Sequence, residues 1–77
     1  LRFLLSMEIR ETFARNLKKY RNAKGLSQEE LAHQADLDRT YISSLERCVY
    51  AASIDVLGRI ADVLEIKPSD LLEETEE

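Results

Sequence analysis

Side chains able to do covalent or metal chemistry are few and isolated in this sequence. His33 is the only histidine, and no set of Cys, Asp or Glu ligands accompanies it. We interpret it as a surface residue, and Cys48, which has no identifiable base or oxyanion site, as a structural or incidental thiol. The only two glycines, Gly25 and Gly58, exclude a Gly-rich phosphate loop. The sequence therefore predicts that the protein is not an enzyme and uses no metal or cofactor.

Hydrogen-bonding and cationic side chains instead fall on one face of residues 39–47. Ile42 and Leu45 stand three apart and form the inward side of a short helix, which begins after the candidate N-cap Asp38. This spacing turns five polar or charged side chains outward: Arg39, Thr40, Ser43, Ser44 and Arg47.

Residues 28–35 form a second short helix that must position this face. Ser27 is a candidate N-cap, and Glu30 stands three residues on, where its side chain completes a capping box. Asp36 falls where the chain must reverse, because Asp tolerates the left-handed conformation better than most residues. The positions expected to face inward are Leu31, Ala32, Ala35 and Leu37.

The stretch 28–47 resembles the helix-turn-helix of Cro/CI-type (XRE-like) DNA-binding proteins. The offsets that this family uses for packing and turn residues are occupied here by Gln28, Ala32, Asp36, Leu37, Ile42 and Leu45. The run from Leu37 to Arg47 is closer still to the controller proteins of bacterial restriction-modification systems. The resemblance implies an all-α, compact five-helix lambda-repressor-like domain, with the helix-turn-helix formed by helices 2 and 3.

The resemblance also implies roles for the outward side chains. The start of the second helix of the motif enters the major groove, so Arg39, Thr40 and Ser44 are the expected base readers, with Arg39 bonding O6 and N7 of guanine. Lys24 is an alternative to Arg21 as a phosphate contact, and an ion pair within the domain competes for Arg47. The expected phosphate-binding residues are Gln28, Tyr41, Ser43, Arg47, Arg21 and Tyr50.

The loop 48–52, Cys-Val-Tyr-Ala-Ala, departs from the family pattern. The family carries polar residues and a Pro-Ser step here, and only Ser53 matches. This leaves Tyr50 as the one hydroxyl donor for a phosphate, while an apolar loop that covers the edge of the core is the competing interpretation.

Three further helices complete the expected fold. A helix over 8–23, ended near Gly25, follows from apolar residues at helical spacing: Ile9, Phe13, Leu17 and Tyr20. Its outer face would carry Arg15, Lys18, Lys19 and Asn22. Ser53 caps an amphipathic fourth helix, and Pro68 begins a short last helix that reaches Glu74.

The apolar half of the fourth helix is wider than one small core requires, so part of it is expected to face a second subunit. The resemblance adds the last helix to that interface. The expected interface residues are Val56, Ile60, Val63, Ile66, Leu71 and Leu72. Such a homodimer would bind an inverted-repeat operator of double-stranded DNA with half-sites about 34 Å apart.

Length and charge limit the number of domains and the classes of partner. The 77 residues make one small domain (1–77), with 1–7 as an N-terminal extension and 75–77 as an acidic frayed tail. The net charge is −4, but residues 1–61 carry ten cations and eight acids, a balance of +2, which is weak evidence for nucleic acid. The opening Leu-Arg-Phe-Leu-Leu-Ser is too short for a signal peptide or a membrane span.

Met7 is interpreted as the natural start; the alternative is that Phe3, Leu4 and Leu5 cap the core or pair with a second subunit. One cysteine allows no disulfide within the chain, which indicates a reducing compartment, the cytoplasm. As a DNA-binding protein it is expected to be associated with the nucleoid.

The resemblance to controller proteins implies a homodimeric transcription factor that binds palindromes upstream of its own gene and of an endonuclease gene. RNA polymerase is a further candidate partner. The alternatives are a phage-type repressor or toxin-antitoxin regulator of the same fold, and a protein-interaction module that binds no DNA.

Overall fold

The computed structural model describes the backbone of residues 2–74 and the side chains of residues 9–74. Its elements are α1 (Arg2–Ala23), α2 (Gln28–Ala35), α3 (Arg39–Glu46), α4 (Ile54–Leu64) and the 3-10 helix η1 (Pro68–Leu72). No strand occurs between residues 2 and 74. The all-α prediction is confirmed, but the fifth element is a 3-10 helix that ends at Leu72, because Glu73 is already extended (φ −85°, ψ 132°).

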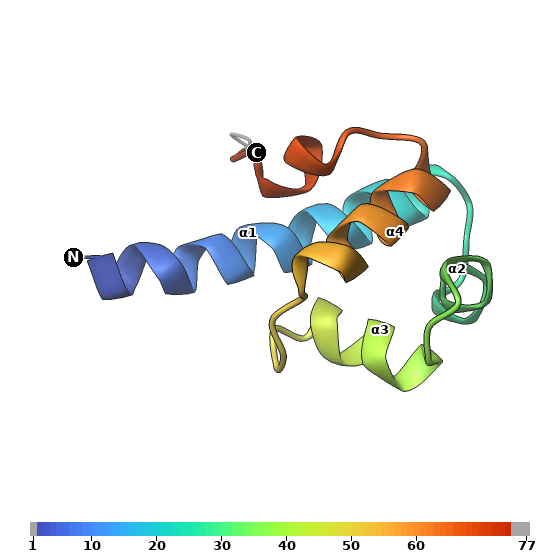
Figure 1. Ribbon diagram of the computed structural model, residues 1–77, viewed down its shortest axis with the longest axis horizontal. Coiled ribbons are helices and arrows are strands. Elements are labelled where there is room, and N and C mark those ends of the chain that lie inside the picture. The colour runs from blue at the N-terminus through green and yellow to red at the C-terminus, as the bar shows by residue number, and fades with distance from the viewer. Residues whose placement is uncertain (1, 75–77) are drawn as a thin grey trace.

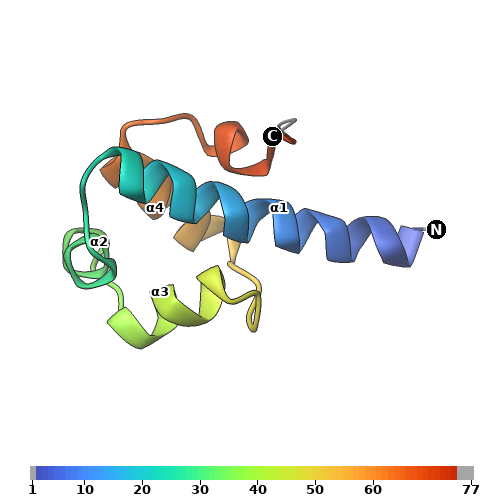
Figure 2. The ribbon, with the colours of Figure 1, turned by 180° about the vertical axis from the view of Figure 1, so that it is seen from behind.

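Helix α1 runs along the long axis of the molecule, which measures 37 × 22 × 19 Å. The pair α2 and α3 lies on one side of α1, and η1 lies on the other side (Figures 1 and 2). Helix α4 contacts both α2 and η1, so it joins the two sides. The helix-turn-helix pair is thus supported from behind by α1 and α4.

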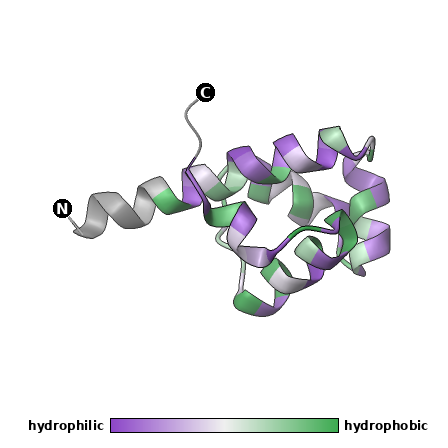
Figure 3. Ribbon diagram, turned by 90° about the horizontal axis from the view of Figure 1, so that it is seen from above, coloured by the Kyte–Doolittle hydropathy of each residue, from purple (hydrophilic) through white to green (hydrophobic). Residues whose placement is uncertain are grey.

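Every element contributes to a single core. Fully buried apolar side chains come from each of them: Leu17 of α1, Leu31 of α2, Ile42 and Leu45 of α3, Ile60 of α4 and Leu71 of η1. Hydrophobic and hydrophilic residues alternate along the described helices (Figure 3), as expected for amphipathic helices around one core. No helix in residues 2–74 has the length and apolar character needed to cross a bilayer.

The predicted start of α2 and the turn after it are confirmed. Ser27 Oγ accepts the Glu30 N–H (3.0 Å), while Glu30 Oε1 accepts the Ser27 N–H (2.8 Å), which completes the capping box. Asp36 is left-handed (φ 59°, ψ 48°), and the Leu37 N–H donates to the Ala32 carbonyl (2.8 Å). These local bonds reverse the chain between α2 and α3.

The first helix differs from the prediction at its beginning. It starts at Arg2 rather than Glu8, so the expected extension 1–7 is helical from residue 2. Ile9, predicted to face inward, is 54% exposed because α1 extends beyond the shorter helices that cover its later turns. The proposed roles of Phe3, Leu4 and Leu5 depend on side chains outside the described ones, and the expected fraying of 75–77 falls outside the described residues.

The end of α3 has a backbone conformation that its sequence does not favour. Cys48 has a positive φ of 62°, its N–H donates to the Leu45 carbonyl (3.1 Å), and the next N–H, of Val49, donates to the Ser44 carbonyl (2.9 Å). Glycine is the residue that usually occupies this left-handed position after a helix. The thiol therefore stands where a residue without Cβ would be less strained.

Replacing Cys48 by glycine is expected to raise the free energy of unfolding by about 0.5–1 kcal/mol, because the left-handed conformation would then carry no Cβ penalty. Urea unfolding of the reduced protein measures the change. The control is Cys48→Ala, which removes the thiol and keeps Cβ, and which should give no gain. Equal gains in both variants would trace the effect to the thiol and contradict the backbone explanation.

Candidate nucleic-acid interface

The exposed start of α3 carries the side chains predicted to read bases. The Asp38 carboxylate accepts the Thr40 N–H (3.2 Å), which confirms the predicted cap and sets the first turn of the helix. Arg39 and Thr40 are both exposed in that turn. Arg39 also lines a shallow hollow with Gln28 and Glu29 at the start of α2. One guanidinium and one hydroxyl therefore stand free on the surface formed by the starts of α2 and α3.

Ser44 does not belong to this surface. The prediction that it faces outward is wrong, because it is only 5% exposed. The chain turns back at Cys48, and the bond from the Val49 N–H to the Ser44 carbonyl brings the loop against the last turn of α3. A buried side chain cannot reach a base edge, so its predicted base contact is withdrawn.

Arg21 is also unavailable for the phosphate contact expected of it. Its guanidinium is buried and binds Glu46 through two nitrogens, Nε to Oε2 (2.6 Å) and Nη2 to Oε1 (3.1 Å). Its Nη1 donates to the Leu26 carbonyl (2.7 Å). The prediction is wrong because the carboxylate that neutralises Arg21 comes from the end of α3, far away in sequence.

Gln28 joins the same polar cluster, which we define as Arg21, Gln28 and Glu46. The Gln28 amide donates from Nε2 to Glu46 Oε1 (3.0 Å), and the Glu46 side chain is only 4% exposed. The cluster connects the end of α1, the start of α2 and the end of α3. Because an amide nitrogen carries two N–H groups, the half-buried Gln28 retains one donor for a phosphate.

The remaining phosphate candidates differ in exposure. Tyr50 in the loop is exposed and Tyr41 half-buried, with ring centroids 6.3 Å apart and planes tilted by 42°. Ser43 is half-buried. Arg47 is exposed and forms no ion pair with any residue in 9–74, because Glu46 is bound by Arg21. Phosphate contacts by Tyr41, Ser43, Arg47 and Tyr50 therefore stay predictions compatible with their surroundings.

Lys24, the alternative to Arg21, lies directly after the end of α1. It is exposed and pairs with Glu65 (Nζ to Oε1 2.5 Å). The hydrogen bond and the positive charge of Lys24 lower the pKa of the Glu65 carboxyl below its ordinary value of 4.5. Both groups are exposed, so the pair contributes little to stability and Lys24 can exchange it for another anion.

Comparisons with known proteins decide the family. The helix-turn-helix family model matches residues 17–71. The chain belongs to the helix-turn-helix family. The control protein C.BamHI of Bacillus amyloliquefaciens is 39% identical over 92% of this chain and 89% of its own length.

Two solved structures share the fold of this helix-turn-helix protein. The restriction-modification controller protein C.AhdI of Aeromonas hydrophila is 39% identical, with a TM-score of 0.78 over 80% of this chain and 94% of that one. The biofilm regulator SinR in complex with DNA is 35% identical, with a TM-score of 0.77 over 79% of this chain and 98% of that one. These relatives are regulators and control proteins, which confirms the predicted DNA-binding regulatory family and that the chain is not an enzyme.

The helix-turn-helix protein buries half of its predicted dimer interface in its own core. Ile60 and Leu71 are fully buried and Val56 nearly so, while Val63 and Ile66 pack partly against the core. The prediction is wrong for Val56, Ile60 and Leu71, because α2 and η1 cover α4 from two sides and use its wide apolar surface within one chain. Only Leu72 of the predicted set is an exposed large apolar residue.

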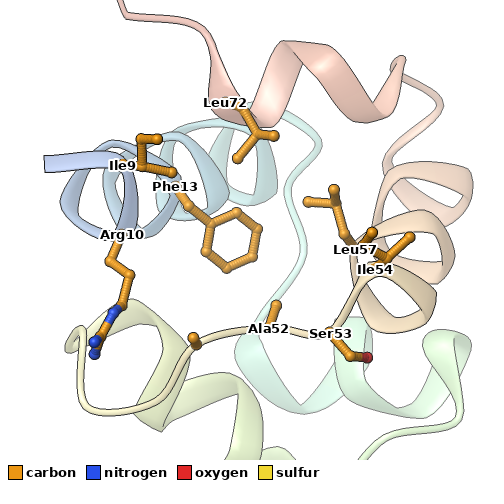
Figure 4. Close-up of a pocket in the computed structure, with 9 residues that line it drawn as sticks. Ile9, Arg10, Phe13, Ala52, Ser53, Ile54, Leu57 and Leu72 are labelled. Carbon is orange, nitrogen blue, oxygen red and sulfur yellow. The ribbon is translucent and has the colours of Figure 1, made fainter. Parts of the chain in front are cut away.

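Three of the exposed large apolar residues, Ile9, Ile54 and Leu72, lie elsewhere, around a hollow of about 210 Å³ between the start of α4, α1 and η1 (Figure 4). We call it the apolar groove, and it is lined by Ile9, Arg10, Phe13, Ala51, Ala52, Ser53, Ile54, Leu57 and Leu72. Ile54, at its rim, is 85% exposed. The sequence did contain a signal for Ile54, since the first residue after a helix cap lies at the end of an element, where neighbouring helices seldom cover it.

Proposed function

We propose that this helix-turn-helix protein binds an inverted-repeat DNA operator as a homodimer and serves as a restriction-modification controller. In this role it regulates its own gene and an endonuclease gene. The observation that carries the proposal is the exposed pair Arg39 and Thr40 at the start of α3, on a helix anchored by the Arg21, Gln28 and Glu46 cluster.

Arg39 and Thr40 are the proposed base readers. A guanidinium presents parallel N–H donors that match O6 and N7 of guanine, and a threonine offers a hydroxyl and a methyl group. Gln28, Tyr41, Ser43, Arg47 and Tyr50 are the proposed phosphate contacts.

Replacing Arg39 by alanine is expected to weaken binding to the cognate operator by about 1–3 kcal/mol and to relax one base position, while random DNA is bound nearly as before. Fluorescence anisotropy with both DNAs over a salt series measures this, and binding of the wild type should weaken steeply as salt rises. The control is Arg15→Ala, which removes the same charge from the exposed outer face of α1. Equal losses on cognate and random DNA would refute base reading by Arg39.

The apolar groove is the proposed contact between the two copies. Ile54 projects at the rim of a hollow that has room for an apolar side chain. Each copy therefore offers both a projecting side chain and a hollow that can receive the partner's, as a two-fold interface requires. Leu57 and Leu72 line the same groove, so the proposed interface includes the last element.

Replacing Ile54 by lysine is therefore expected to convert the dimer to a monomer, because each interface would bury two unpaired charges. Sedimentation velocity across a concentration series measures the state. Val49→Lys is the matched control, since Val49 is also an exposed apolar residue but lies outside the groove. Dimers that persist in Ile54→Lys would exclude the groove as the interface.

Gene neighbours separate the regulatory roles. An adjacent endonuclease gene supports the controller role, whereas phage or toxin genes would assign the phage-repressor or toxin-antitoxin role. Such a regulator acts in the cytoplasm at promoter DNA of the nucleoid, where footprinting with RNA polymerase would test for that further partner.

A further inference from the structure

One side chain from α4 holds the turn of the helix-turn-helix. Arg59 donates from Nε (3.1 Å) and Nη2 (3.0 Å) to the carbonyl oxygen of Ala35, and from Nη2 to the carbonyl oxygen of Asp36 (2.5 Å). The last carbonyls of a helix have no partner within the helix. Arg59, 24 residues beyond Ala35, therefore supplies donors that α2 cannot supply itself.

The carbonyl bonds, rather than the nearby carboxylate, account for this contact. Asp36 Oδ2 is 4.0 Å from Nη2 and its side chain is fully exposed, so their ion pair contributes little. The guanidinium charge also lies at the negative end of the α2 dipole, which favours the same placement. The planar fork of arginine suits two neighbouring carbonyls better than a single ammonium does.

The position of Arg59 links two surfaces that the proposed function uses. The turn it holds is followed within three residues by Arg39, the first residue of α3. Its own helix begins with Ile54 and contains Leu57, which line the apolar groove. We infer that Arg59 is a positioning residue for DNA recognition, which sets the place of Arg39 and Thr40 relative to the contact between two copies.

This inference rests on the proposed function, and it predicts a specific consequence for DNA with two half-sites. If the turn between α2 and α3 is no longer held to α4 by Arg59, the two copies of α3 in the dimer no longer keep one fixed separation. Affinity for the operator then falls, and the preference for one half-site spacing weakens. Binding to random DNA, which depends on phosphate contacts alone, changes little.

The alternative for Arg59 is a direct phosphate contact, since its side chain is half-exposed. The two roles differ in salt dependence. Loss of a phosphate contact weakens all DNA alike and reduces the slope of log affinity against log salt by about one. Loss of a positioning residue leaves that slope unchanged.

The test uses the full chain with Arg59→Met and Arg59→Lys. Each variant is titrated with an operator selected from random DNA by the wild type, with that operator shortened or lengthened by one base pair between half-sites, and with random DNA. We expect Arg59→Met to bind the operator about tenfold more weakly, to discriminate less between spacings, and to bind random DNA within about twofold of the wild type. Arg59→Lys should recover most of the affinity, because an ammonium can donate to the same carbonyls.

Two controls make the result decisive. Arg15→Met removes an exposed guanidinium of α1 and should leave all affinities unchanged. Urea unfolding at the assay temperature establishes that each variant is folded when it is titrated. Arg59→Met that binds every DNA like the wild type, or equal losses on all DNA with a smaller salt slope, would overturn the positioning role while the proposed function stands. A wild type that selects no inverted repeat would overturn both.

Discussion

Replacing Glu46 by alanine should lower the free energy of unfolding by about 3–5 kcal/mol, because the buried Arg21 guanidinium would lose its carboxylate partner among residues 9–74. Gln28 would lose an acceptor at the same time. The ends of α1 and α3 would then be joined by packing alone. Urea unfolding monitored by circular dichroism measures the loss, and titration of operator DNA should show weaker binding even where the variant is still folded.

The double variant Arg21→Met with Glu46→Leu distinguishes two causes of the lost stability, the unpaired charge of Arg21 and the missing contact between α1 and α3. Most of the stability should return, because the uncompensated cation is gone and apolar side chains fill similar space. If Glu46→Ala alone cost less than about 1 kcal/mol, Arg21 would have reached water or another acceptor, and the cluster would not anchor α3.

Replacing Leu45 by alanine is expected to cost about 2–5 kcal/mol of unfolding free energy, because the side chain is buried where α3 packs against α1 and α2. The surrounding helices cannot close a cavity of three carbon atoms completely. Denaturant titration measures the midpoint and slope, and loss of DNA binding should follow the fraction unfolded.

Ile54→Ala is the matched control for Leu45→Ala, since it truncates a similar side chain that is 85% exposed. At protein concentrations where the wild type is monomeric, it should change the unfolding free energy by no more than about 0.5 kcal/mol. Equal costs for the two truncations would contradict the placement of Leu45 in the core.

Local features of the fold follow directly from the sequence. The capping box of Ser27 and Glu30, the left-handed Asp36 and the cap Asp38 are all confirmed. Each depends on atoms within a few residues of one another, so residue type and spacing suffice to predict it. The same holds for the inward positions of α2 and α3, which repeat with the period of a helix.

Predictions that depended on distant neighbours were less successful. Arg21 looked free until α3 brought Glu46, 25 residues away in sequence, to it. Ile60 looked available to a second copy, but α2 and η1 both pack on α4. In each case the sequence shows a side chain's chemistry and not which remote segment will cover or bind it.

The sequence by itself therefore determined the family, the helix-turn-helix and the identity of the exposed residues at the start of α3, because these follow from short-range spacing. Only the tertiary structure decided which polar groups are hydrogen-bonded within the domain, which apolar residues are exposed to solvent, and that Arg59 binds the turn between α2 and α3. Those outcomes depend on packing between segments more than 20 residues apart, where one additional contact can bury a group that local spacing would leave exposed.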